Sequence, residues 1–358
     1  MKDTQGQLED QFSFFELHLS RLKCLCFLVS GLLQLRTVNL RILSLSFPEK
    51  SKASSSYRRI QRFLASFSFP LDRLSRFVWD HFIGQAPIVL AIDRTNWKLG
   101  RSNINILMLS ICREGFAVPL MWKVLGNKRG NSSQKERIEL LKRFLKVISP
   151  DQQIHLVADR EFLGEEWINW LDYNYIHFVI RIRSNQLIEH SGRNAQRASS
   201  VFSSETWKGL RKKRWIKGSE VYMGGQKLKQ SRGKKADYLI LISNLPIKTA
   251  KCLYARRWGI EVLFGELKSR GFNFEDTHIT IPDRIENLIA LLTMAHIWAV
   301  KTGLWIIKQT KEIPIKKHGR KAISILAISI FRIGLDLIQQ KLLNNSDLQY
   351  LVNLLSCT

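Results

Sequence analysis

The chain has 358 residues, of which 45% are hydrophobic, so it can bury a substantial core and is expected to form about two or three domains. Its 56 lysines and arginines outnumber 30 acidic residues and leave a formal net charge of +26. This composition excludes a disordered chain and favours a polyanionic partner over a small neutral ligand.

Nucleic acid and an anionic membrane surface are both suitable partners for a chain with this positive charge. The apolar segments distinguish between the two. The two most hydrophobic windows, 24–33 and 288–300, are both shorter than the roughly 20 residues that a spanning helix needs. We therefore expect both to be core helices, with no membrane partner. The N-terminal segment is acidic and polar and does not have the basic start of a signal peptide, which indicates a cytoplasmic protein.

The cysteines and histidines do not indicate a disulfide framework or a soft-metal site. The five cysteines are scattered without a CxxC pair, and the eight histidines do not show clustered ligand spacing. We expect these residues to be packed in the core or to lie at the surface.

Residues 1–85 read as a helical DNA-binding domain. An amphipathic run at 12–35 and a second helix near 37–45 precede "ASSSYRRIQRFLASF", whose serines are expected to cap a third helix. Arg58, Arg59 and Arg62 would then project from the first turns of a helix that enters the major groove of DNA. The alternative is a basic surface helix without a recognition role.

Strands and helices alternate in residues 86–275. "APIVLAIDRTNW" predicts a buried strand that ends in Asp93, and "QQIHLVADREF" predicts another that ends in Asp159. Two strands and a capped helix lie between them, and a helix and a strand follow. This β, β, β, α, β, α, β order predicts an α/β fold with a mixed sheet covered on both faces.

A basic stretch at about 185–247 interrupts that order with short β-like runs, so we expect a β-rich insertion. Within it, Trp207 and Trp215 flank "KGLRKKR" and could stack on the bases of a distorted strand. The alternative is that both fill the small core of the insertion. Residues 276–358 are expected to form a helical C-terminal region.

Between these parts, "YARRWGIEVLFGELK" (254–268) predicts a helix with one polar face. At about 100° per residue, Tyr254, Arg257, Glu261 and Lys268 fall in a single stripe. Glu266 lies about 120° away from Tyr254 and is not part of the stripe. A solvated ladder of ion pairs would give the same pattern.

Asp93, Asp159 and Glu261 together are the candidate catalytic residues. Three converging carboxylates cannot all stay ionised without cations, and hard oxygen ligands suit Mg²⁺ or Mn²⁺. A pair of such ions promotes phosphoryl transfer, the chemistry of a polyanionic substrate. Glu161 follows Asp159 closely, and its role stays open.

The spacing Y-x2-R-x3-E-x6-K, with "AIDRTNW" and "VADREF" before it, resembles the DDE transposases of bacterial insertion sequences, specifically the insertion sequence 4 family. The resemblance implies a ribonuclease-H-like catalytic domain with a β insertion. Asp93, Asp159 and Glu261 would bind two Mg²⁺ ions, for which Mn²⁺ can substitute. Tyr254, Arg257 and Lys268 would bind phosphates at the transposon end.

The same resemblance implies cut-and-paste transposition, with hydrolysis at the terminal inverted repeats and strand transfer into target DNA. Its partners would be the double-stranded DNA of the transposon ends and of the target. A DNA hairpin intermediate, a synaptic homodimer and a location in the bacterial cytoplasm at the nucleoid would follow. The rival interpretations are a ribonuclease-H-like nuclease or resolvase without strand transfer, and an inactive transposase derivative that acts as a DNA-binding repressor.

Overall fold

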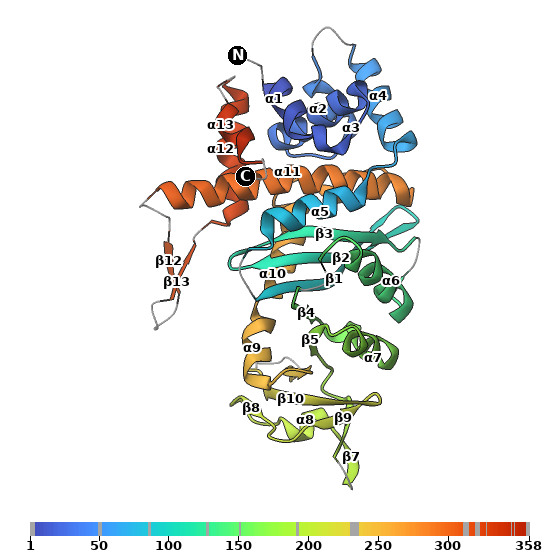
Figure 1. Ribbon diagram of the computed structural model, residues 1–358, viewed down its shortest axis with the longest axis vertical. Coiled ribbons are helices and arrows are strands. Elements are labelled where there is room, and N and C mark those ends of the chain that lie inside the picture. Colours follow the sequence, from blue (N-terminus) through green and yellow to red (C-terminus); the bar gives the residue numbers. More distant parts are fainter. Residues whose placement is uncertain are drawn as a thin grey trace.

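A computed structural model of the protein describes residues 4–48, 52–84, 87–126, 129–149, 152–190, 193–229, 236–310, 315–318, 323–326, 328–344, 346 and 348–355. Figure 1 shows an elongated molecule with helices at one end, the central sheet in the middle and a small β-rich part at the other end.

The N-terminal part is helical, as the sequence predicts. Its helices are α1 (Thr4–Gln11), α2 (Leu19–Leu35), α3 (Leu40–Leu43), α4 (Ala53–Ser66) and α5 (Leu71–Phe82). The Asn39 side chain caps α3 by accepting from the backbone N–H groups of Arg41 and Ile42. The expected serine caps of α4 are wrong, because Lys52 occupies the N-cap position and the serines lie inside the helix.

The helices of this part are packed onto the rest of the protein. Figure 1 shows α5 between the long helix α11 (Pro282–Gln309) and strand β3 (Phe116–Val124). The Ser75 hydroxyl donates to the carbonyl of Leu120 in β3 at 2.7 Å. Asn287 of α11 donates to the carbonyls of Leu64 and Phe67 at the end of α4. The N-terminal helices and the sheet therefore share a continuous core.

A mixed sheet forms the centre of the protein, in the predicted order. Its first three strands are antiparallel neighbours, and β4 and β5 continue the sheet in parallel with β1. Their bounds are β1 (Ile88–Leu99), β2 (Ser102–Arg113), β3 (Phe116–Val124), β4 (Ile154–Ala158) and β5 (His177–Arg181). The crossover helices are α6 (Gln134–Leu145) and α7 (Glu165–Tyr173). Asp93 does not end its strand as predicted, because β1 continues to Leu99 in antiparallel pairing with β2.

The predicted β insertion extends this sheet instead of forming a separate one. Its elements are β6 (Leu187–His190), β7 (Arg193–Arg197), α8 (Ala198–Val201), β8 (Lys208–Gly209), β9 (Arg214–Ile216), β10 (Ser219–Lys227) and β11 (Tyr238–Ser243). Strand β11 pairs antiparallel with β5, so the ladder runs without a break from the central sheet into the insertion.

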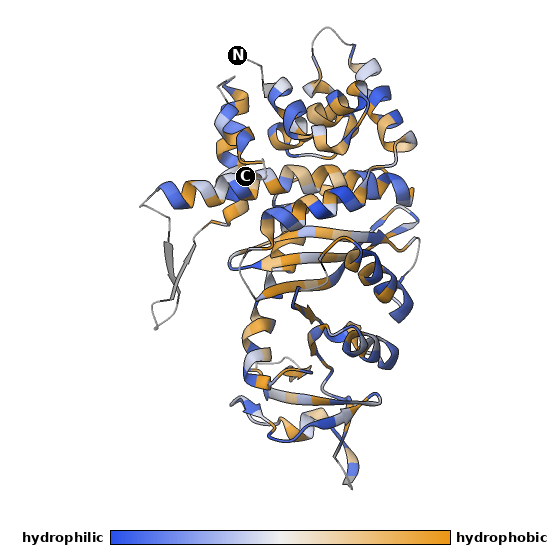
Figure 2. Ribbon diagram, in the orientation of Figure 1, coloured by the Kyte–Doolittle hydropathy of each residue, from blue (hydrophilic) through white to orange (hydrophobic). Residues whose placement is uncertain are grey.

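The last part of the chain is mainly helical and contains one long core helix. Its elements are α9 (Ile247–Ala255), α10 (Trp258–Leu267), α11 (Pro282–Gln309), β12 (Ile315–His318), β13 (Ile323–Leu326), α12 (Ile330–Leu343) and α13 (Gln349–Asn353). The β12–β13 hairpin departs from the helical structure predicted for most of 276–358. Figure 2 shows hydrophobic residues along the middle of α11 and along the strands beside it.

Helix α11 has the length and apolar composition of a membrane span, with a mean hydropathy of 1.4, but 78% of its apolar window is buried inside the protein. This burial confirms the expected core helix. Two glycines allow α12 to approach it closely: a Cβ at Gly334 would lie 1.8 Å from the Ala299 carbonyl oxygen, and one at Gly303 would lie 2.0 Å from that of Ile330.

Candidate functional site

The segment that carries the polar stripe is two helices instead of the single predicted one. Helix α9 ends at Ala255 and α10 begins at Trp258. Across the junction the Arg257 N–H donates to the Tyr254 carbonyl at 3.0 Å, and the Ile260 N–H donates to the Arg257 carbonyl at 3.1 Å. These i to i−3 bonds tighten the turn between the two helices.

Asp93 and Asp159 are brought together by the parallel pairing of β1 and β4. Ile92 is the register partner of Ala158, and each aspartate is the next residue along its own strand. Neighbouring strands lie about 4.8 Å apart, so the two carboxylates project from adjacent positions at the same edge of the parallel ladder. The sequence prediction that these residues converge is supported by this register.

Arg257 joins Asp93 to Glu261. One guanidinium nitrogen donates to Asp93 Oδ2 at 3.3 Å, and another donates to Glu261 Oε1. The Arg257 side chain is only 11% exposed, so this charge pairing is shielded from solvent. Of the predicted site residues, these three are in direct contact.

Burial also changes the protonation of Asp93. Desolvation raises the pKa of its carboxyl to about 6, with the negative charges of Glu161 and Asp159 adding to the rise. The Arg94 backbone N–H and the Arg257 guanidinium oppose the rise. Asp159 Oδ1 is buried and has no hydrogen-bond partner in the part of the chain that the structure describes.

Glu161 is held in place by an arginine that the sequence analysis did not single out. Arg94 donates to both carboxylate oxygens of Glu161, at 2.6 and 2.8 Å. Arg137 donates to the Glu161 backbone carbonyl at 2.9 Å, which fixes the turn after Asp159. Glu161 is therefore neutralised by Arg94, and the pair supports the segments that carry both aspartates. The feature of the sequence that could have indicated this pair is Arg94 itself, a charged residue directly after Asp93 in a buried strand.

Tyr254 lies beside Arg257, whereas Lys268 forms a separate ion pair. The Tyr254 hydroxyl is buried, and burial raises its pKa to about 12. The Arg257 guanidinium lies 5.6 Å from the Tyr254 ring centroid. Lys268 pairs with Glu275 at 2.7 Å and lies 5.3 Å from the Trp97 ring centroid.

Glu266 is outside the site, as predicted. Its carboxylate is buried and lies 2.9 Å from the Nε2 atom of His296, which is itself fully buried on α11. Glu266 thus connects α10 to the core helix.

The arginines of α4 do not all face solvent. Arg58 and Arg62 are exposed. Arg59 points back into its own module, where it donates to the Ser20 carbonyl at 2.9 Å and lies 5.7 Å from the Phe47 ring centroid. The prediction of three groove-facing arginines is therefore wrong for Arg59, because α2 and the segment before α4 bind its guanidinium.

The two tryptophans of the insertion differ in their surroundings. Trp207 is partly buried against the core, with the Lys251 ammonium 4.5 Å from its ring centroid. Trp215 is 44% exposed, but its cross-strand neighbours are Glu220 and Glu189. Exposure favours base stacking by Trp215, whereas the two carboxylates beside it repel phosphates. Stacking by either residue stays a prediction.

The donor atoms suit a hard divalent cation, although they are not grouped as ligands. Among the described residues no three His, Cys, Asp or Glu side chains are close enough together to hold a metal ion. Arg257 instead supplies the positive charge between Asp93 and Glu261. Asp159 Oδ1, buried without a partner beside Asp93, is the kind of oxygen that Mg²⁺ or Mn²⁺ accepts.

Comparisons with known proteins give the family. The profile described as "Transposase DDE domain" matches residues 84–298, which is more than half of the chain and extends from before β1 into α11. No curated protein matches the chain. Among solved structures, the cryo-EM structure of a piggyBac transposase synaptic complex with hairpin DNA is 13% identical, with a TM-score of 0.43 over 94% of this chain and 78% of that chain. The protein belongs to the transposase DDE domain family and is therefore a DDE transposase, an enzyme of the polynucleotidyl transferase type.

Proposed function

We propose that this transposase moves its own insertion sequence by a cut-and-paste reaction and belongs to the insertion sequence 4 family. The catalytic domain would be ribonuclease-H-like, with Asp93, Asp159 and Glu261 as the catalytic carboxylates. The observation that carries the proposal is the Arg257 contact with Asp93 and Glu261, next to an aspartate that is adjacent in strand register. Residues that are far apart in the sequence therefore lie together at one edge of the central sheet, where Arg257 forms ion pairs with two of them.

DDE transposases generally depend on divalent metals, and we assign the metal to Asp93, Asp159 and Glu261. When bound, two Mg²⁺ ions would activate an attacking oxygen and stabilise the leaving oxygen of a phosphodiester. Burial raises the pKa of Asp93 to about 6, and a cation bound there would lower that pKa by stabilising the ionised carboxylate.

The chain's own residues would position the DNA. The guanidinium of Arg257 already holds two carboxylates, so its predicted binding of a phosphate requires that the phosphate replaces one of them. The Arg94–Glu161 pair would keep the segments around both aspartates in place.

The proposed partners follow from the charge and the family. A net charge of +26 suits double-stranded DNA, first at the transposon ends and then at the target. We further propose a homodimer in the synaptic complex, a hairpin intermediate, and a location at the nucleoid in the bacterial cytoplasm.

Isosteric substitution tests the carboxylate assignment. Asp93→Asn, Asp159→Asn and Glu261→Gln should each abolish cleavage of labelled end DNA in Mg²⁺ and leave end binding, measured by gel shift without metal, close to the wild-type level. Glu139→Gln is the matched control, since Glu139 is exposed and pairs with Lys123 at the surface. Normal cleavage by the Glu261→Gln variant would refute the assignment.

The same assay separates the rival functions. A transposase yields both cleaved ends and joined products when target DNA is present. A nuclease or resolvase yields cleaved ends that are never joined to the target. A repressor binds the ends and cleaves nothing at any metal concentration.

A further inference from the structure

A cavity of about 460 Å³ lies where the end of α2, the turn after α10 and the first turn of α12 meet. Each of these segments contributes one arginine to its lining, namely Arg36, Arg270 and Arg332. We name this feature the three-arginine cavity. Like charges that converge in this way repel each other, so their arrangement around one space needs an explanation.

Only part of this positive charge is balanced by the protein. Arg332 pairs with Asp336, one turn further along α12, at 2.8 Å. Arg36 and Arg270 form no ion pair with a carboxylate among the described residues. Burial, followed by the charge of Arg332, lowers the pKa of the Arg36 guanidinium. Two guanidinium groups that face one cavity without a carboxylate partner indicate an anionic ligand.

Glu266, the acidic residue in the lining, does not take the place of that ligand. Its side chain is only 4% exposed, and its carboxylate lies 2.9 Å from the Nε2 atom of His296 on α11. Among the described residues it forms no ion pair with any of the three arginines. The carboxylate of Glu266 is therefore engaged by the core helix.

Arg36 is held at a cost to stability. It is the C-cap residue of α2 and has a φ of 54°, in the left-handed region where glycine is the usual residue. Its Nε atom is buried and has no partner in the described part of the chain, and its guanidinium donates to the Arg270 carbonyl at the long distance of 3.4 Å. An anion that accepts from Nε would remove the cost of this unsatisfied donor.

Hydrogen bonds outside the cavity fix the segments that surround it. Gln339 of α12 donates to the Gln34 carbonyl of α2 at 2.8 Å, and the Asn273 side chain donates to the Arg36 carbonyl at 3.2 Å. Ser329, which also lines the cavity, is the N-cap of α12. The first N–H groups of that helix add a favourable dipole to the charge of the arginines.

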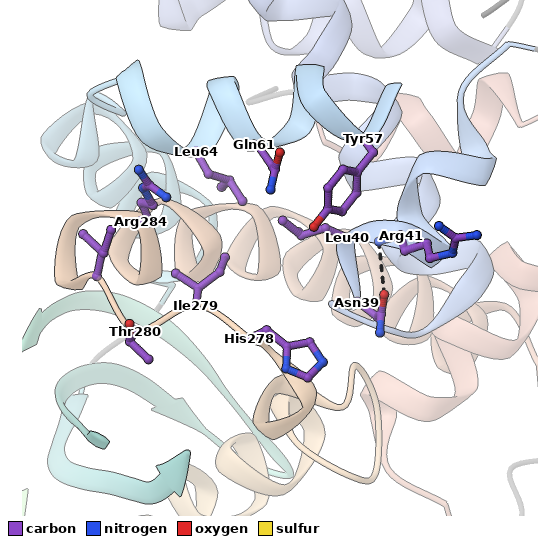
Figure 3. Close-up of a pocket in the computed structure, with 11 residues that line it drawn as sticks. Asn39, Leu40, Arg41, Tyr57, Gln61, Leu64, His278, Ile279, Thr280 and Arg284 are labelled. Carbon is purple, nitrogen blue, oxygen red and sulfur yellow. Dashed lines mark hydrogen bonds between the residues drawn. The ribbon is translucent and has the colours of Figure 1, made fainter. Parts of the chain in front are cut away.

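Figure 3 shows another cavity, between α4 and the segment before α11, that does not share these features. Apolar side chains such as Leu40, Leu64 and Ile279 form much of its lining. Among the described polar side chains around it, none has a buried atom without a partner. The three-arginine cavity is therefore the stronger candidate for a ligand site.

We propose that the three-arginine cavity binds the phosphate group of a small ligand, as inorganic phosphate or a phosphate monoester. The planar fork of a guanidinium matches two phosphate oxygens, and Arg36 and Arg270 together balance the two charges of the group. The volume of the cavity suits a small molecule. This inference goes beyond the proposed function, because it concerns a site that takes no part in the DNA reaction.

The ligand would join α2 and α12 to the helix that carries a candidate catalytic residue. Val262 lines the cavity and directly follows Glu261 on α10. A phosphate held between Arg36 and Arg270 would therefore stabilise the position of α10 from the side of the N-terminal helices.

Thermal melting of the full chain, without DNA or divalent metal, tests the site. The probe is 10 mM inorganic phosphate, compared with sodium chloride at the same ionic strength so that screening of the net charge is equal. A dissociation constant of about 1 mM would raise the Tm by about 2 °C. Adenosine monophosphate should give a similar rise and adenosine none, because the phosphate group is what binds.

Arg36→Met and Arg270→Met remove a guanidinium and keep an apolar side chain of similar reach. Each should lose most of the phosphate-dependent rise and bind phosphate at least about tenfold more weakly in calorimetry, which is the loss of one charge-assisted contact. Arg73→Met is the matched control and should keep the wild-type rise, since Arg73 is an exposed arginine that pairs with Glu16.

Melting without phosphate distinguishes a ligand contact from a structural role of Arg36. Arg36→Met should then melt no lower than the wild type, because it removes a buried donor that has no partner. A lower Tm together with an unchanged phosphate-dependent rise would show that Arg36 only supports the fold, and this result overturns the proposal.

Gel shifts with a duplex of random sequence distinguish a small ligand from the DNA backbone as the source of the phosphate. Both methionine variants should keep the wild-type salt slope of duplex binding. A slope reduced by about one in each variant, with no phosphate-dependent rise in the wild type, would assign the arginines to DNA and overturn the proposal. If the phosphate results hold while the wild type cleaves no end DNA, the proposed function alone is wrong.

Discussion

Asn287→Ala should destabilise the protein by releasing α4 from the core helix. The Asn287 side chain is buried, and its Nδ2 donates to the carbonyls of Phe67 at 2.7 Å and Leu64 at 3.2 Å. Its Oδ1 accepts from the Phe69 N–H at 3.3 Å. Alanine removes all three bonds and leaves three backbone groups without these partners.

The expected loss is about 3 kcal/mol, because each buried polar group left unsatisfied costs roughly 1 to 3 kcal/mol and the longer bonds contribute least. Urea unfolding followed by circular dichroism measures this as a lower midpoint with an unchanged m-value. The loss should be accompanied by weaker end binding at a temperature at which the variant remains folded, because the placement of α4 depends on this residue.

Two further variants make the result interpretable. Asn287→Asp keeps the acceptor for the Phe69 N–H but removes both donors and buries a charge, so it should be at least as destabilising as alanine. Asn344→Ala, at the exposed C-cap of α12, should change the free energy of unfolding by less than about 0.5 kcal/mol. A free energy of unfolding for Asn287→Ala that equals the wild-type value would refute the assigned role.

Trp207→Ala should lower the free energy of unfolding by about 2 kcal/mol because the side chain is partly buried in the core, whereas Trp215→Ala, at a 44% exposed position, should change it by less than about 0.5 kcal/mol. If Trp215 stacks on a base, its variant should also reduce hairpin yield on a denaturing gel without reducing the first nick, and an unchanged yield would end that assignment. Glu266→Ala should destabilise the fold by about 3 kcal/mol, since it removes the partner of the buried His296, and a mild effect in urea unfolding would show that the pair contributes little. Burial, followed by the neighbouring charge of His177, lowers the pKa of His155, so the folded state binds fewer protons than the unfolded state just below the ordinary histidine pKa. Stability should therefore fall as the pH drops through that range, and His155→Gln should show a smaller fall in urea midpoints between pH 7 and pH 5.

The sequence determined the order of elements and the identity of the charged residues. Alternation of apolar strands with amphipathic helices is a local property, and it correctly placed β1 to β5, α6, α7 and the β insertion. The capping box of α6 was also readable, because Ser133 and Glu136 are only three residues apart. The exclusion of Glu266 from the site followed from helical periodicity, and its burial against His296 agrees with it.

Only the tertiary structure decided how those residues meet. The register of β1 and β4 sets Asp93 beside Asp159, and no local pattern encodes which residues of two distant strands pair. The tightened turn at Arg257 separates α9 from α10, so the single continuous helix predicted for this segment is wrong.

The same reason explains the residues that the sequence did not reveal. In the sequence Arg59 does not differ from its exposed neighbours Arg58 and Arg62. In the structure α4 packs against α2, and the Arg59 guanidinium points inward to the Ser20 carbonyl. Asn287 fixes the end of α4 against α11 across more than 200 residues of sequence, and such long-range contacts depend on packing that a one-dimensional pattern does not contain.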